Sequence, residues 1–420
     1  MSGDLKLLLV LFIVFLVVVI LTIIMVTVVR RTVALRRYRI LDKRRKEFDG
    51  KIRGMLDRGE KPEAFSIFSF PHRSLEWQAV ESVLFSLLED KKYEAHAYVL
   101  FDRLGYRVYY EKMLTRRNVI EKSSAADKLG RMHCEASVGK LVLLLEEENP
   151  EVASVTMRAL SKIGSTAALK AVLYQVPGLY SRLLVTRKSI AQALLNFGPK
   201  AVPEMVQAGE RYGDPVAKAF ILQVLKELKS VEALPFAFKC LKHSAPEVRS
   251  KALTMIASAG GDLSPEEKDK ILPLLDDPVW FVRLQAARTV GLLRHCPTPS
   301  LLEKRMLDEK WQVRNAAVAA VIMAASDPVE VFLETLSSKD RYAKESICEE
   351  IQKTGFVYQL IENLDPPGTP SCEKSLKVLG IMASLGYGTP VLEYMKNNPD
   401  SVIARELATI MPADRKGAVR

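Results

Sequence analysis

The hydrophobic pattern divides the chain into one uninterrupted apolar stretch near its start and a long amphipathic remainder. From Leu7 to Val29 the only polar side chains are Thr22 and Thr27. Beyond residue 72 apolar positions recur every three or four residues in one segment after another, with turn residues between the segments and no strand-like alternation. The pattern predicts an all-α chain with one long apolar helix and many shorter amphipathic helices.

The apolar stretch is long enough to cross a lipid bilayer. Its 23 residues span roughly 34 Å as a helix at about 1.5 Å per residue. A cleaved signal peptide is the alternative, but its apolar core is shorter, and basic residues precede that core instead of following it. No A-x-A-like cleavage site follows the stretch either. We predict a transmembrane helix at residues 7–29, after a short translocated N-terminus at residues 1–6.

Basic residues gather directly after the predicted transmembrane helix. Residues 30–58 contain 12 Lys and Arg against 4 Asp and Glu, so this segment supplies most of the net charge of +11. By the positive-inside rule, the chain after residue 30 is expected on the cytoplasmic side, most simply of a bacterial inner membrane. The basic side chains either solvate the membrane boundary or bind anionic lipid head groups. Those nearest the apolar stretch are Arg30, Arg31, Arg36, Arg37, Arg39, Lys43, Arg44, Arg45 and Lys46.

Two short segments separate the membrane boundary from the remainder. Residues 30–58 are predicted to form a juxtamembrane helix or stalk. The loose heptad spacing of Leu41, Phe48, Ile52 and Met55 suggests that this stalk dimerises. Residues 59–72 are expected to form a connector whose phenylalanines cover the open end of the first helical pair.

A repeating unit of 31–34 residues runs through most of the chain. Each unit has a turn, a valine, and then a helix with apolar residues every three or four positions; the aligned valines are Val152, Val185, Val216, Val248, Val282 and Val313. A glycine that ends the unit recurs at Gly130, Gly164, Gly198, Gly260, Gly355 and Gly386. Two helices fill such a period, and a pair cannot bury its apolar face alone, so neighbouring pairs must stack. We therefore predict a solenoid over residues 73–415, with a frayed C-terminus at residues 416–420.

The turns of this unit carry residues that begin helices. Asn149, Asp214 and Asp277 are each followed by a proline. The expectation is that the polar side chain caps the helix and that Pro150, Pro215 and Pro278 occupy the first helical position, where no N–H is needed.

At these residues the sequence resembles the HEAT repeat family, which has Pro or Asp in the turn, Val-Arg, and small residues in the second helix. The resemblance covers roughly residues 115–415 and implies a HEAT-like α-α superhelical solenoid. HEAT repeats also have an Asp six residues before the Arg, and these residues form a ladder along the array. Asp277 with Arg283 and Asp308 with Arg314 match that spacing, whereas Arg249 has His243 at the Asp position. The resemblance specifies a fold and implies no catalytic activity.

No motif for catalysis, cofactor binding or metal binding is present in the sequence, so we expect neither enzyme activity nor a cofactor. The pairs His133-Cys134 and His295-Cys296 are adjacent in sequence, and neighbours on a helix face different directions. The five cysteines show no CxxC spacing, which is typical of free thiols in a reducing compartment.

Three classes of function fit a HEAT-like array. The first is a membrane-anchored scaffold that binds a protein partner, itself membrane-associated. The second is nucleic-acid binding, which the near-neutral charge of residues 59–420 disfavours. The third is a lyase or chaperone acting on a cofactor-bearing protein. We predict the scaffold; Trp280 and Trp311, which enter consecutive repeats, either form a ridge for the partner or pack between repeats.

Overall fold

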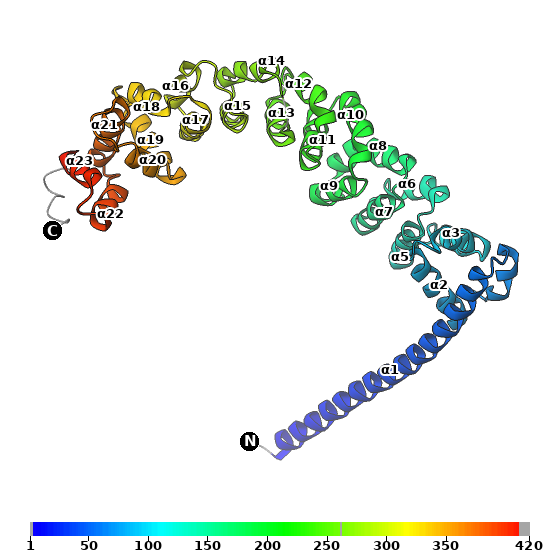
Figure 1. Ribbon diagram of the computed structural model, residues 1–420. Helices are drawn as coiled ribbons and strands as arrows, with labels where there is room; N and C mark the ends of the chain where they lie inside the picture. The colour runs from blue at the N-terminus through cyan, green and yellow to red at the C-terminus, as the bar shows by residue number, and fades with distance from the viewer. Residues whose placement is uncertain (1–2, 261–262, 411–420) are drawn as a thin grey trace. The chain divides into compact units, whose positions relative to one another are not determined.

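The computed structural model describes residues 3–260 and 263–410, and within these residues every regular element is a helix (Figure 1). The chain is an α-helical repeat solenoid with one long apolar helix at its N-terminus, as the hydrophobic pattern predicted. The frayed C-terminus predicted at residues 416–420 and the end of the solenoid predicted at residue 415 lie outside the described residues.

Two compact units make up the chain. The first consists of Met1–Gln175 and Arg182–Asn196, and the second of Val176–Ser181 and Phe197–Arg420. The elements of the first unit are α1 (Gly3–Asp57), η1 (Pro62–Phe68), α2 (Leu75–Leu88), α3 (Glu94–Arg103), α4 (Tyr106–Met113), α5 (Val119–Arg131), η2 (Glu135–Ser137), α6 (Val138–Leu144), α7 (Pro150–Ile163), the start of α8 (Thr166–Arg182) and α9 (Arg187–Leu195).

The second unit continues as helical pairs. Its earlier elements are η3 (Pro199–Ala201), α10 (Val202–Arg211), α11 (Pro215–Glu227), η4 (Val231–Ala233), α12 (Leu234–Cys240), α13 (Pro246–Ala259), α14 (Pro265–Asp269), η5 (Leu272–Asp276) and α15 (Trp280–Leu292). Its later elements are α16 (Ser300–Met306), α17 (Trp311–Ala324), α18 (Pro328–Leu336), α19 (Arg341–Thr354), α20 (Phe356–Glu362), α21 (Pro370–Ser384), α22 (Thr389–Asn397) and α23 (Val402–Ile410). Within this unit α11, α13, α15, α17 and α19 form one row, and α10, α12, α16 and α18 lie on its other side (Figure 1).

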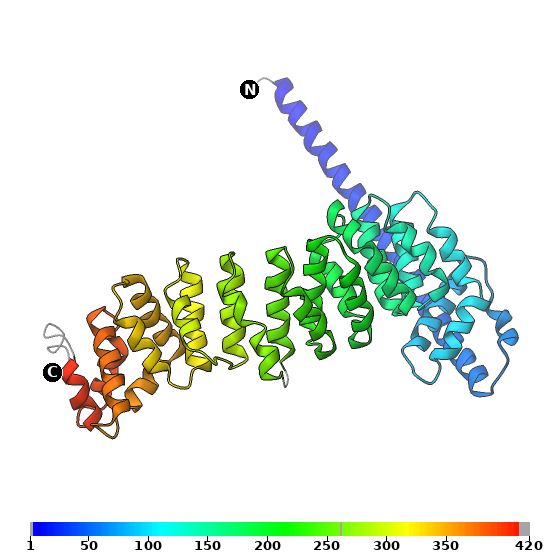
Figure 2. The same ribbon diagram turned by 90° about the horizontal axis from the view of Figure 1, so that it is seen from above.

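Helix α1 is continuous over 55 residues, so it has no break at the predicted boundary between residues 29 and 30. It extends away from the rest of the first unit, and only its C-terminal part packs against it (Figure 2). Phe48, Ile52 and Met55 are buried there, next to α2. The suggestion that these residues dimerise the stalk is therefore wrong, because their apolar face is already covered within the chain.

The connector predicted at residues 59–72 is a folded element. It contains η1, and Phe65 and Phe68 are almost fully buried. The ring of Phe48 lies 5.7 Å from that of Phe68 and 5.5 Å from that of Phe70, centroid to centroid. The phenylalanines thus pack on the end of α1, and this packing joins α1 firmly to the first unit.

The repeat period places one buried residue at the same point of successive helices. The third residue after the N-cap is fully buried in several of them, as shown by Val152, Val248, Val282 and Val313. The other two aligned valines do not fit this position. In α11 the cap is Asp214, so the buried residue is Ala217 and Val216 is 46% exposed. Val185 lies before Thr186, the cap of α9, and so is outside the helix.

The recurring glycines have two different roles. Gly164, Gly198, Gly260, Gly355 and Gly386 have positive φ angles, which a glycine adopts without strain at the end of a helix. Gly130 is the next-to-last residue of α5 and, unlike the other five, has no positive φ angle. A Cβ atom on Gly130 would lie 2.5 Å from the Cα of Ala159 in α7. A Cβ atom on Gly291 in α15 would likewise lie 2.9 Å from the Cα of Ala320 in α17. The absence of a side chain at both glycines therefore lets the two helices of each pair pack closely.

Candidate functional site

The Arg and Asp side chains of the predicted ladder link successive repeats of the second unit. Arg283 at the start of α15 binds Asp308 before α17 with two bonds, Nε to Oδ2 at 2.7 Å and Nη2 to Oδ1 at 2.9 Å. Arg249 in α13 binds Asp277 before α15 in the same way, at 2.7 and 2.8 Å. Both pairs are largely buried, so each carboxylate pairs with the arginine of the preceding repeat.

The six-residue spacing within a repeat produces a different contact. Arg283 donates from Nη1 to the backbone oxygen of Asp277 at 3.0 Å, and Arg314 donates to the backbone oxygen of Asp308 at 3.0 Å. The six-residue spacing therefore places each guanidinium on the turn of its own repeat. The six-residue spacing does not identify Arg249 as a member of the ladder, because its own repeat has His243 at the Asp position. Arg249 Nη1 nevertheless donates to the backbone oxygen of His243 at 2.8 Å.

The turn before α15 differs from the expectation. Asn149 and Asp214 cap α7 and α11, as predicted, and Pro150 and Pro215 begin those helices. Helix α15 begins at Trp280, so Pro278 precedes it, and the Asp277 carboxylate accepts the Val279 N–H at 2.9 Å.

The ladder ends at Arg314, which has no carboxylate partner among the described residues. Its Nε donates to Ser346 Oγ at 3.1 Å, and its guanidinium lies over the ring of Tyr342. Asp308 is the most enclosed carboxylate of the ladder. Burial acts to raise the pKa of Asp308, but the hydrogen bonds from Arg283 and from the Lys310 N–H outweigh it and hold the pKa below its ordinary value.

The two tryptophans of the predicted ridge differ in exposure. Trp280 is half-buried and contacts Phe281, whereas Trp311 is 58% exposed. Tyr342 follows Trp311 after another 31 residues and is 68% exposed. Sequence reasoning missed Tyr342 because only tryptophans were aligned. Trp311 is therefore not packed between repeats, and an aromatic side chain recurs once per repeat at these three positions, half-buried at Trp280 and exposed at Trp311 and Tyr342.

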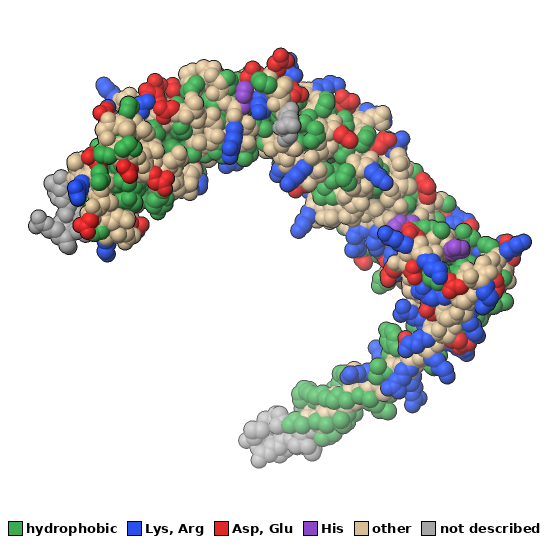
Figure 3. Space-filling view, viewed as in Figure 1, with side chains coloured by type: hydrophobic (Ala, Val, Ile, Leu, Met, Phe, Trp, Pro, Cys, Tyr) green, Lys and Arg blue, Asp and Glu red, His purple; other side chains and the backbone are tan. Residues whose placement is uncertain are grey.

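The basic residues after the apolar stretch fall into two groups. Arg37 and Arg44 reach α2, where Arg37 donates to Gln78 at 3.2 Å and Arg44 lies 3.9 Å from Glu76. The others are exposed along α1, and of these Lys46 pairs with Asp42 and Arg45 lines a hollow beside α2. Figure 3 shows the apolar side chains of α1 followed by these Lys and Arg side chains. All nine basic residues are exposed, Arg37 and Arg44 included.

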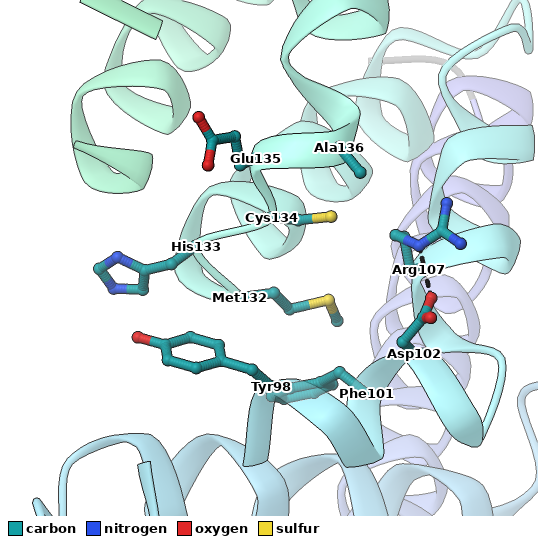
Figure 4. A pocket seen from close by; sticks show the side chains of 9 residues that line it. All are labelled: Tyr98, Phe101, Asp102, Arg107, Met132, His133, Cys134, Glu135 and Ala136. Carbon is teal, nitrogen blue, oxygen red and sulfur yellow. Dashed lines mark hydrogen bonds and ion pairs between the residues drawn. The ribbon is translucent and has the colours of Figure 1, made fainter. Parts of the chain in front are cut away.

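The pocket around His133 and Cys134 has a volume of about 310 Å³ and lies within the first unit. The imidazole of His133 and the thiol of Cys134 point to opposite sides (Figure 4). Two charged residues of the pocket, Arg107 and Asp102, form an ion pair with each other, with 2.5 Å between Nε and Oδ1. In the described part of the chain no three His, Cys, Asp or Glu side chains are placed to hold a metal ion. All five cysteines lie in the described part and are free.

Comparison with known proteins identifies the repeats. Residues 202–291 and 237–323 match the family model of HEAT repeats. Residues 202–323 therefore match HEAT repeats. Comparison with curated proteins gives no match.

Solved structures with a similar helical array include the karyopherin Kap121p and importin beta. A crystal structure of Kap121p has 12% identity and a TM-score of 0.35 over 80% of this chain and 49% of that one. A structure of importin beta has 11% identity and a TM-score of 0.40 over 82% and 59% of the two chains. Kap121p bound to the extreme C-terminus of the phosphatase Cdc14p has 15% identity and a TM-score of 0.40 over 83% and 48%. The chain thus spans about half the length of these structures.

Proposed function

We propose that this protein is a membrane-anchored, non-catalytic scaffold whose HEAT-type solenoid binds a protein partner on the cytoplasmic side of the membrane. Helix α1 carries the proposal. It is long and apolar enough to cross a membrane, and none of its apolar window is buried. Soluble proteins rarely expose an apolar surface of this extent, and a bilayer would cover it.

Helix α1 also supports a stiff connection between the membrane and the first unit. Beyond its apolar part, α1 is held by Arg53, which lies 3.1 Å from Asp90, and by Asp57, which accepts from Lys92 at 2.6 Å and from Tyr93 at 2.9 Å. The first unit is therefore attached to the anchor through a packed helix. Such an attachment suits a protein that presents a surface at a defined place near the bilayer.

The basic residues from Arg30 to Lys46 support the cytoplasmic placement and contact with anionic head groups. A positively charged flank stays on the cytoplasmic side. Each basic residue near an anionic surface contributes about 1 kcal/mol, and salt weakens this attraction. Those on the exposed faces of α1 remain available for lipids.

The row of Trp280, Trp311 and Tyr342 is the surface that we propose for the protein partner on the second unit. Exposed aromatic side chains are enriched where proteins bind one another, because they bury a large area with few rotatable bonds. Solenoids use such regularly spaced positions as extended binding surfaces.

Three experiments test the proposed function. Carbonate extraction should leave the full chain in the membrane fraction, and protease added to the cytoplasmic side should digest everything after residue 30. Affinity capture from these membranes should recover a stoichiometric protein with the native chain. Recovery should fall with Trp311→Ala and persist with Tyr174→Ala, a variant of another highly exposed aromatic residue. Release by carbonate, or tight retention of nucleic acid with no protein partner, would overturn the proposal.

A further inference from the structure

Two adjoining hollows lie along α2, between α1 and α5, within the first unit. The first, of about 460 Å³, is flanked by Leu41 of α1 and Ile120 of α5. The second, of about 330 Å³, is flanked by Arg45 of α1 and Arg131 of α5. Glu81 lines both. The hollows therefore form one groove, here called the α2 groove, with α1 and α5 as its walls and α2 as its floor, to which Tyr109, Tyr110 and Met113 of α4 add in the first hollow.

The groove runs parallel to α1. Arg37 of α1 binds Gln78 near the start of α2, and Arg53, further along α1, binds Asp90 just beyond the end of α2. Later residues of α1 thus meet later residues of α2, so the two helices point in the same direction.

Helix α5 follows the same direction on the other side. Arg73, just before α2, binds Glu121 in the first turn of α5 at 2.6 Å. Glu81 in α2 accepts from Lys128, further along α5, at 2.7 Å. The Leu41 and Ile120 end of the groove is therefore the end nearest the apolar part of α1.

The floor of the groove is shaped for another helix. Ser82 and Ser86, one turn apart on α2, line the second hollow, and small side chains at this spacing let a second helix approach closely. Ile120 at the open end is 75% exposed. The groove thus has small polar side chains on the floor of its second hollow and aromatic side chains in its first, next to an exposed apolar residue at the membrane-side end.

The walls of the second hollow carry a surplus of positive charge. Arg45 and Arg131 are exposed, and no carboxylate partner is described for either within residues 11–260. Arg131 lies over the ring of Phe85, and Glu89 is the exposed carboxylate of this hollow. The other charges there, Lys128 and Glu81, neutralise each other. Acidic side chains would therefore complement the two walls.

We propose that the α2 groove binds the cytosolic continuation of a transmembrane helix of the partner, with acidic side chains facing Arg45 and Arg131. This inference rests on the proposed membrane anchoring by α1. A helix that leaves the bilayer beside α1 continues along the groove without a bend, because both run in the same direction. From Val29 to Leu41 is about 18 Å of helix, and α2 is about 21 Å long. The partner segment therefore extends about 25 residues beyond the membrane.

Photo-crosslinking in native membranes tests this inference. A benzoyl-phenylalanine is placed at Ile120 of the full chain, an exposed residue on the wall of the groove, and the adduct is digested and sequenced by mass spectrometry. The expected adduct is a peptide within about 30 residues of the cytosolic end of a partner's transmembrane helix. Charge reversal by Arg45→Glu with Arg131→Glu should lower the adduct yield at least about tenfold, because like charges facing each other across an interface are strongly disfavoured.

The matched control changes charge equally at the far end of α2. Lys61 and Lys91 are both exposed there, and Lys61→Glu with Lys91→Glu should leave the yield within about twofold. An adduct with lipid, with a soluble protein or with a second copy of this chain would overturn the inference, as would no adduct. A second benzoyl-phenylalanine at Leu21, which should crosslink lipid in every variant, separates failure of the groove from failure of membrane anchoring.

Discussion

Replacing Arg283 by Met should loosen the contact between α15 and α17. Its guanidinium makes a two-bond contact with Asp308, whose side chain is 3% exposed. Removing one partner of a buried ion pair costs about 3–5 kcal/mol, because the remaining charge stays buried. Asp308 keeps the Lys310 N–H at 3.0 Å and Arg305 at 3.4 Å. We therefore expect the lower end, about 3 kcal/mol.

Hydrogen exchange measures this cost locally, because a repeat array opens in parts and has no single unfolding transition. In the full chain held in nanodiscs, about 3 kcal/mol corresponds to roughly 150-fold faster exchange of the α15 and α17 amides. Lys304→Met is the control, since Lys304 pairs with Asp276 in an exposed position. It should accelerate exchange less than about fivefold.

The double variant Arg283→Met with Asp308→Leu separates the buried charge from the rest of the contact. Replacing both members of a buried pair by apolar side chains is often close to neutral. The lost bond to the Lys310 N–H should leave about 1 kcal/mol of destabilisation. Equal acceleration by Arg283→Met and Lys304→Met would refute the view that the buried pair stabilises adjoining repeats.

Three other predictions follow from the packing and the charges. Asp308→Asn should destabilise α17 at neutral pH, and its difference from the native chain should shrink as pH falls below about 3.9. The reason is that the native Asp308 has a lowered pKa and loses its contribution only on protonation; a difference that is constant with pH would contradict this. Gly130→Val should destabilise α5 by more than about 2 kcal/mol, whereas Gly50→Ala, with open space around it, should stabilise α1 by up to about 1 kcal/mol; hydrogen exchange of the α5 and α1 amides compares the two. Trp77→Ala should cost about 3–5 kcal/mol in α2 because Trp77 is buried, while Trp311→Ala should change exchange of the α17 amides little; similar acceleration by both would contradict the burial argument.

The fold was predictable because stacking leaves a period in the sequence. A residue buried in every repeat must be apolar, so Val152, Val248, Val282 and Val313 recur at fixed intervals and are all fully buried. The alignment failed at Val216 because Ala217 is equally acceptable in the buried position. The repeat period alone does not show which of two adjacent apolar residues in such a helix is the buried one.

The pairing of the ladder residues was harder to predict from the sequence because each ion pair joins two different repeats. Spacing within one repeat pointed from Arg283 to Asp277, and the structure shows that this spacing serves a backbone contact. The carboxylate partner, Asp308, lies in the next repeat. Arg249 has no Asp six residues earlier, so only the three-dimensional stacking of α13 on the turn before α15 reveals its pairing.

The end of α1 illustrates why helix packing between distant segments is hard to predict from local pattern. The heptad-like spacing of Phe48, Ile52 and Met55 correctly indicates a helix with one apolar face, but spacing does not say what covers that face. The connector leads back along α1 before α2 begins, so that α2 runs beside α1 in the same direction and covers its apolar face. This path also places α2 parallel to the apolar segment, with α5 on its other side. The groove between α1 and α5 thus follows from the same packing that excludes the dimeric stalk, because α2 occupies the apolar face of α1 and leaves Arg45 free beside it.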